Sequence, residues 1–131
     1  MKKQNIIIDT DPGVDDATAI TIALFNENLD IKLITTTSGN VGIDTTTRNA
    51  LFLVEKFNKD VPVCMGASKP LIRPAKNAFS IHGVEGLGGY TPFTPTKKVD
   101  PTPFEDKMFE IIKQNAGNIK LIELGPHTNL A

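Results

Sequence analysis

The stretch Ile6-Ile-Ile-Asp-Thr-Asp-Pro-Gly-Val-Asp-Asp16 decides the fold of this chain. Its three isoleucines form a short β-branched run, which is typical of a buried strand. The Asp, Pro and Gly residues that follow favour a turn. The segment from Asp15 to Asn26 is rich in Ala, Ile and Leu and predicts a helix with Ile20 and Leu24 on its inner face. The sequence therefore passes from strand through an acidic turn into a helix.

The alternation of strand and helix continues along the chain. A second strand is predicted from Ile31 to Thr37, a second helix from about Asp44, and a third strand from Val61. Prolines and glycines then interrupt residues 66–101 too often for any long element, and a connection of this length is usually a functional loop. Two further elements follow: a helix that begins at the capping-box pattern Thr102-Pro-Phe-Glu105 and a strand from Ile119 to Leu124.

This order of elements predicts an α/β fold, a Rossmann-like parallel sheet covered by helices, in one domain over residues 1–131. Ligands of such folds bind beyond the carboxyl ends of the strands. The first strand carries the acidic turn to that edge of the sheet. We therefore expect the functional site there, with residues 66–101 as an active-site loop.

Composition narrows the classes of function. The 131 residues are 40% hydrophobic and 22% charged, with a formal net charge of −1, as is typical of a globular protein in water. This charge balance gives no support for nucleic-acid binding, and no apolar stretch approaches the length of a membrane span or signal-peptide core. The single cysteine, Cys64, allows no intrachain disulfide. We expect a cytoplasmic protein that binds a small molecule.

The acidic turn is the strongest candidate for a cation site. Four carboxylates follow the first strand directly: Asp9, Asp11, Asp15 and Asp16. Like charges at such short range raise one another's pKa, so packing them together without a cation is costly. Oxygen ligands with no nearby His or Cys favour a hard cation, Ca²⁺ or Mg²⁺.

Alternatives to this interpretation remain open at this point. An EF-hand loop is excluded because Val14 and Ile20 stand where that loop requires glycine and glutamate. A metal-dependent phosphatase of the strand-loop Asp-x-Asp type shares the opening Asp9-Thr-Asp11, although it has Gly13 at the motif's fifth position. A solvated turn followed by a helix N-cap is the purely structural alternative.

The run from Asp9 to Asp16 resembles the signature Asp-x-Asp-Pro-Gly-x-Asp-Asp of the inosine-uridine-preferring nucleoside hydrolase family. Further segments match the family in order: Thr37-Ser-Gly-Asn40, Val61-Pro-Val63, His82-Gly83, Gly86-Leu-Gly88 and Gly125-Pro-His-Thr-Asn129. The resemblance implies the N-terminal part of the nucleoside hydrolase fold. It also implies calcium-dependent hydrolysis of the N-glycosidic bond of purine or pyrimidine ribonucleosides to ribose and free base, in a full-length protein that is a homo-oligomer, a dimer or tetramer.

The resemblance assigns the metal ligands first. Asp11 and Asp16 would bind Ca²⁺ through carboxylate oxygens, and the backbone carbonyl of Leu124 would be a further ligand. Asp11 would also be the catalytic base that takes a proton from the metal-bound water. Asp9 would support the loop through backbone contacts.

The resemblance also assigns three residues to the substrate. Asp15 and Asn40 would contact the ribose hydroxyls, and His82 would lie near the leaving base. Thr128 and Asn129 are interpreted as caps of the helix that follows.

The end of the chain bears on activity. The sequence stops at Ala131 where another helix is due to begin, which suggests a truncation, and family members supply further ligands from their C-terminal half. Ca²⁺ would be under-ligated with the remaining donors, so we expect the 131-residue chain to hydrolyse nucleosides slowly or not at all. An inactive fragment, or a cation- and ribose-binding module, is therefore the alternative to an active enzyme.

Overall fold

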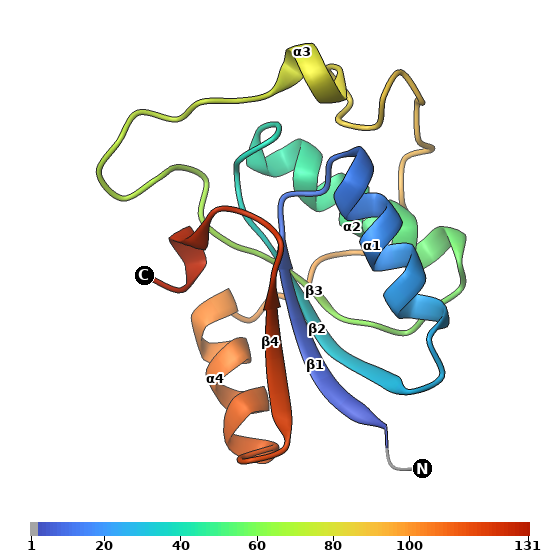
Figure 1. Ribbon diagram of the computed structural model, residues 1–131, viewed down its shortest axis with the longest axis vertical. Helices are drawn as coiled ribbons and strands as arrows, with labels where there is room; N and C mark the ends of the chain where they lie inside the picture. The colour runs from blue at the N-terminus through green and yellow to red at the C-terminus, as the bar shows by residue number, and fades with distance from the viewer. Residues whose placement is uncertain (1–2) are drawn as a thin grey trace.

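The computed structural model describes residues 3–131 and confirms the predicted α/β fold. Within these residues, one parallel sheet has the strand order β3-β2-β1-β4 (Figure 1). Its strands are β1 (Gln4–Thr10), β2 (Leu29–Thr36), β3 (Val63–Met65) and β4 (Ile119–Glu123). The chain therefore builds outward from β1 on one side and then returns to add β4 on the other side of β1.

Helices cover both faces of this sheet. Helices α1 and α2 lie on one face and α4 on the other, while α3 belongs to the long segment that crosses above the sheet (Figure 1). The helices are α1 (Val14–Phe25), α2 (Ile43–Lys56), α3 (Phe79–His82) and α4 (Phe104–Gln114), followed by the 3₁₀ turn η1 (His127–Asn129).

The central strand β1 supplies side chains to two cores. Ile6 and Ile8 pack in the cluster under α1 and α2, whereas Ile7 packs with Met108 and Ile111 of α4. Successive strand residues point to opposite faces of a sheet, so one run of isoleucines fills both layers. This double burial fixes the position of the residues directly after β1.

The predicted start of α4 is wrong in detail. The capping box at Thr102 does not form, and Pro103 takes the N-cap position without a side-chain cap, so the helix begins at Phe104. The reason is that the N–H of Thr102 donates to the side chain of Asp100 at 2.9 Å. This local turn, typical of aspartate, sets the entry of the chain into the helix.

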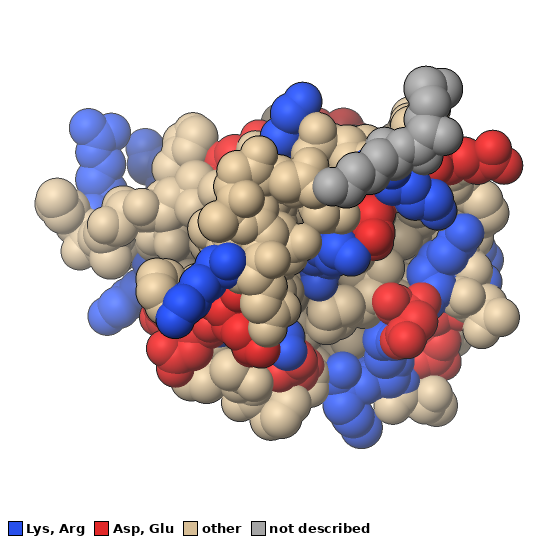
Figure 2. Space-filling model, turned by 90° about the horizontal axis from the view of Figure 1, so that it is seen from below, with Lys and Arg blue, Asp and Glu red and all other residues tan. Residues whose placement is uncertain are grey.

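The surface carries charges of both signs. Figure 2 shows Lys and Arg side chains interspersed with Asp and Glu over the face seen from below the view of Figure 1. Among residues 3–131, no helix is long and apolar enough to cross a lipid bilayer.

Candidate active site at the carboxyl ends of the strands

The acidic turn of residues 9–16, called the acidic loop from here on, lies where the strand order of the sheet changes direction. β1 pairs with β2 on one side and with β4 on the other, so the order in which strands are added along the sheet reverses at β1. Open α/β sheets bind ligands at such a switch point. The loop after β1 meets the loop after β2, which carries Asn40, and the main chain after β4, which carries Gly125.

Asp11 is the central carboxylate of this site. It is 4% exposed, and its Oδ2 accepts a hydrogen bond of 2.6 Å from the backbone N–H of Asn40. Two glycines allow neighbouring chain segments to approach it. A Cβ on Gly39 would lie 2.1 Å from Oδ2 of Asp11, and one on Gly125 would lie 2.9 Å from Oδ1. The carboxylate is thus enclosed by backbone from two other loops.

The surroundings of Asp11 change its acidity. Burial raises the pKa of Asp11 to about 6, the hydrogen bond from Asn40 opposes this shift, and the negative charge of Asp16 adds to it. Part of the Asp11 population therefore holds a proton near neutral pH. A positive charge bound at this position would favour the ionised form.

Asp16 reaches the same place from the first turn of α1. It is 5% exposed, and its Oδ1 accepts a hydrogen bond of 2.8 Å from the hydroxyl of Thr10. Its Oδ2 accepts from the N–H of Gly13 at 3.2 Å and from the side-chain amide of Asn40 at 3.0 Å. Because Asn40 also donates to the backbone carbonyl of Asp11 at 3.0 Å, it links the two carboxylate residues.

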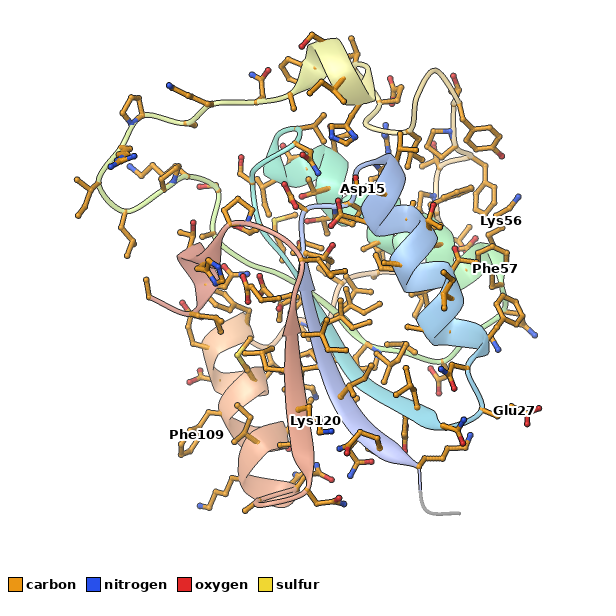
Figure 3. All side chains as sticks on the ribbon, viewed as in Figure 1. Asp15, Glu27, Lys56, Phe57, Phe109 and Lys120 are labelled. Atoms are coloured by element: carbon orange, nitrogen blue, oxygen red, sulfur yellow. The ribbon has the colours of Figure 1, made fainter. Side chains whose placement is uncertain are left out.

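The structure places Asp15 and His82 beside an open hollow along α1, whose lining does not include Asp11, Asp16 or Asn40. Asp15 is exposed at the start of α1, on the same end of the molecule as α3 (Figure 3). Both residues line a hollow of about 790 Å³. Nδ1 of His82 accepts a hydrogen bond of 3.2 Å from the N–H of Val14, and a Cβ on Gly13 would lie 2.6 Å from that nitrogen. The loop carrying His82 thus packs directly on the acidic loop.

Asp9 and Glu123 form a second, buried carboxyl pair on adjacent strands. They are direct neighbours in the β1–β4 ladder. Within the described part of the chain, Oδ1 of Asp9 and both carboxyl oxygens of Glu123 lack a hydrogen-bond partner. Burial, followed by the charge of Asp9, raises the pKa of Glu123 to about 7, and burial also raises the pKa of Asp9. Glu123 is not among the site residues predicted from the sequence.

Asn129 joins three segments at this edge of the sheet. Its Nδ2 donates to the carboxylate of Asp9 at 2.7 Å and to the carbonyl of Thr36 at 3.0 Å, and its Oδ1 accepts from the N–H of Ala67 at 2.8 Å. The interpretation of Asn129 as a helix cap is therefore wrong. Asp9 also accepts a hydrogen bond from the hydroxyl of Thr35, so its side chain supports the site in addition to its backbone.

The predicted ligand set is only partly assembled. The main chain at Leu124 runs beside β1, since its N–H donates to the carbonyl of Asp9 at 2.8 Å. The site thus brings together Asp11, Asp16 and the main chain at Leu124. Within residues 3–131, no group of three or more His, Cys, Asp or Glu side chains is arranged to hold a metal ion. Two carboxylates, those of Asp11 and Asp16, therefore come together at this edge of the sheet.

Comparisons with known proteins identify the family to which this chain is similar. The sequence model of the family described as inosine-uridine preferring nucleoside hydrolase matches residues 6–131. The non-specific ribonucleoside hydrolase RihC of Klebsiella pneumoniae subsp. pneumoniae is 45% identical over 126 residues, which are 96% of this chain and 41% of that protein. The protein of the same name from Salmonella paratyphi A is 42% identical over 127 residues, or 97% of this chain and 42% of that protein.

Solved structures give the same result. The purine-preferring ribonucleoside hydrolase from Gardnerella vaginalis superposes with a TM-score of 0.91 at 28% identity, over 97% of this chain and 42% of that chain. A plant nucleoside hydrolase, PpNRh1, superposes with a TM-score of 0.90 at 39% identity, over 97% of this chain and 41% of that chain. The chain thus spans about 41% of the length of the curated relative from Klebsiella. By its sequence and its fold, this chain belongs to the inosine-uridine preferring nucleoside hydrolase family.

Proposed function

We propose that this chain forms the metal- and ribose-binding side of a calcium-dependent ribonucleoside hydrolase. The observation that carries the proposal is the pair of buried carboxylates, Asp11 and Asp16, which Asn40 holds together at the switch point of the sheet. The family is metal-dependent. Its relatives with matching sequence are described as ribonucleoside hydrolases, whereas no comparison favours the phosphatase alternative.

The donor atoms fit calcium. Asp11 and Asp16 present carboxylate oxygens, and the carbonyl of Leu124 would add a third, in keeping with the preference of Ca²⁺ for oxygen ligands. The glycines at 39 and 125 leave no side chain to fill the space beside Asp11. When bound, the ion supplies positive charge that lowers the pKa of a water molecule and orients the ribose hydroxyls.

Asp11 is the proposed base. Burial raises the pKa of Asp11 to about 6 in the absence of cation, and a bound cation would favour the ionised carboxylate, which is the form that accepts a proton. The hydrogen bond from Asn40 fixes Oδ2, so the orientation of the carboxylate is set before substrate binds. Asp11 would take the proton of the water that attacks the ribose C1′ as the bond to the base breaks.

Three further residues are proposed to contact the substrate. Asp15 is exposed beside the hollow and would accept hydrogen bonds from ribose hydroxyls, to which Asn40 would add its own polar side chain. The N–H of Val14 occupies Nδ1 of His82, which selects the tautomer with a proton on Nε2. The Nε2–H of His82 would serve as a hydrogen-bond donor near the leaving base. The carboxylates would stabilise positive charge on the ribose.

The proposal extends to the setting of the reaction. The substrate is a ribonucleoside with a purine or a pyrimidine base, the products are ribose and free base, and the location is the cytoplasm. A homo-oligomer, a dimer or tetramer, is proposed for the full-length protein. Ca²⁺ takes about six to eight oxygen ligands, more than the donors named here supply, so we expect the 131-residue chain to hydrolyse nucleosides very slowly or not at all.

Calcium titration and two chromogenic substrates test the proposal. Calorimetry should show Ca²⁺ binding that ribose strengthens, that Asp16→Asn abolishes, and that the exposed-site control Asp60→Asn leaves unchanged. The chain should release nitrophenol from p-nitrophenyl riboside, slowly, and not from p-nitrophenyl phosphate. Turnover of the phosphate alone, or a Ca²⁺ affinity indifferent to Asp16→Asn, contradicts the proposal. Calcium and ribose binding without any turnover would indicate a binding module.

A further inference from the structure

Helix α2 contacts both the acidic loop and the loop that carries His82. These two loops are far apart in sequence, yet both contact the same turn of α2, at Arg48 and Asn49. Neither residue belongs to the proposed set of metal or substrate ligands. Their contacts explain how the two halves of the site are held at a fixed separation.

Asn49 makes the direct connection. Its side chain is fully buried, and its Nδ2 donates to the carbonyl of Pro12 at 3.1 Å and to the carbonyl of Glu85 at 2.9 Å. An amide nitrogen has two hydrogens, so each loop receives one. Gly86 allows this approach: it has a φ of +75°, and a Cβ there would lie 2.9 Å from Nδ2 of Asn49.

Arg48 contacts both the side-chain amide of Asn49 and Glu85 in the loop that carries His82. Its guanidinium forms an ion pair with the Glu85 carboxylate, and its Nη2 donates to the Glu85 carbonyl at 3.1 Å. The same Nη2 donates to Oδ1 of Asn49 at 2.9 Å, and Nε does so at 3.3 Å. The side-chain amide of Asn49 is thereby fixed in the orientation that points its nitrogen at both loops. The planar fork of arginine suits several simultaneous acceptors, which a lysine could not bind together.

The loop transmits this anchoring to His82. Glu85 follows His82 by three residues, and the N–H of Gly88 closes the loop by donating to the carbonyl of His82 at 2.8 Å. Asn49, with Arg48, thus anchors the loop that carries His82. Both Asn49 and His82 contact the acidic loop, Asn49 at the carbonyl of Pro12 and His82 at the N–H of Val14.

We propose that Arg48 and Asn49 are positioning residues, which hold the loop of residues 78–89 against the acidic loop and so fix the place and tautomer of His82. The importance of that placement for catalysis rests on the function proposed above. The placement itself is independent of activity and is measured without substrate.

Hydrogen–deuterium exchange on the 131-residue chain tests the anchor. In Arg48→Gln and in Glu85→Gln, the peptides covering residues 79–89 should exchange about tenfold faster, because charge-assisted hydrogen bonds are lost. Peptides from β2 and α4 should exchange as in the parent. The matched control is Lys32→Gln, which breaks the ion pair with Asp30 at similar side-chain exposure, 34% and 42% against 30% and 40%. This control should leave residues 79–89 unchanged.

The tautomer of His82 provides a readout that a purely structural role would not change. The chain has two histidines. Long-range proton–nitrogen spectra should show His82 with its proton on Nε2 in the parent and a mixture of tautomers in Arg48→Gln, while His127 is the same in both. Equal exchange in loop and core peptides, or an unchanged His82 spectrum in both variants, overturns the proposal. A Ca²⁺ affinity that is indifferent to Asp16→Asn contradicts only the proposed function.

Discussion

Replacement of Asp11 by asparagine should stabilise the metal-free chain at neutral pH. Burial raises the pKa of Asp11 from 3.8 to about 6, so the folded state binds this proton more tightly than the unfolded state. A raised carboxyl pKa gives stability that is fully present below pH 3.8 and is lost as the pH rises through 6. The shift of about two units corresponds to about 3 kcal/mol lost at pH 7.5 and about 1 kcal/mol lost at pH 4.5.

Asparagine removes this cost because it cannot ionise. Its Oδ1 can still accept the 2.6 Å hydrogen bond that Asn40 donates to Asp11. We therefore expect Asp11→Asn to raise the free energy of unfolding by about 1–3 kcal/mol at pH 7.5, and by about 1 kcal/mol or less at pH 4.5. Calcium should stabilise the parent and leave the variant unchanged, since a ligand that binds only the folded state raises its stability.

Urea unfolding followed by circular dichroism, with a chelator and then with calcium, measures these differences. The control is Asp60→Asn, whose carboxylate is exposed and pairs only loosely with Lys97 at 3.5 Å. It should change the free energy of unfolding by less than about 0.5 kcal/mol at either pH. The reasoning fails if Asp11→Asn is no more stable than the parent at pH 7.5 without metal, or if its effect is the same at both pH values.

Three further substitutions test the surrounding structure. Burial and the charge of Asp9 raise the pKa of Glu123 from 4.5 to about 7. In urea titrations, Glu123→Gln should therefore raise the free energy of unfolding by about 1–3 kcal/mol at pH 8 and by less than about 1 kcal/mol at pH 5. Gly39→Ala would place a Cβ 2.1 Å from Asp11, and calorimetry should show calcium affinity reduced at least about tenfold. The control is Gly42→Ala, whose Cβ would meet no atom within 4 Å, and it should keep the parent's affinity. Asn129→Ala removes three hydrogen bonds and should lower the free energy of unfolding by about 2–4 kcal/mol, whereas a loss below about 0.5 kcal/mol would show that the bridge contributes little.

The class of fold was predictable because its cause is local. Alternating strand and helix patterns, such as the isoleucines of β1 followed by α1, arise from residues close together in the sequence. The strand order was not predictable in the same way. The β1–β4 pairing joins Asn5 to Ile119, and a strand's own pattern does not state its neighbour. The position of the site at the switch between β1 and β4 therefore required the structure.

The residues of the candidate site fall into two groups, carboxylates and amides, which differ in how far the sequence predicted them. Asp11 and Asp16 stood out in the sequence because clustered negative charge costs free energy unless a cation or hydrogen bonds compensate it, so such clusters are rare without a reason. The neutral amides of Asn49 and Asn129 carry no such cost. An asparagine in a helix or near a turn is ordinary, and nothing in its neighbours reveals that Asn129 contacts Asp9, 120 residues away.

Because the carboxylates are charged and the amides are neutral, substitutions in the two groups should have different effects on the site. Changes to the carboxylates alter charge, and therefore pH dependence and the proposed calcium binding, at positions that the sequence marks. Changes to the amides leave the charge intact and alter the distance between loops that Asn40, Asn49 and Asn129 each hold together. A variant that keeps its calcium affinity but loses the position of His82 would therefore point to the contacts of Arg48 and Asn49 with Glu85, and not to the carboxylates Asp11 and Asp16. In the proposed site, the carboxylates would supply the chemistry, and the amides hold the loops that carry it.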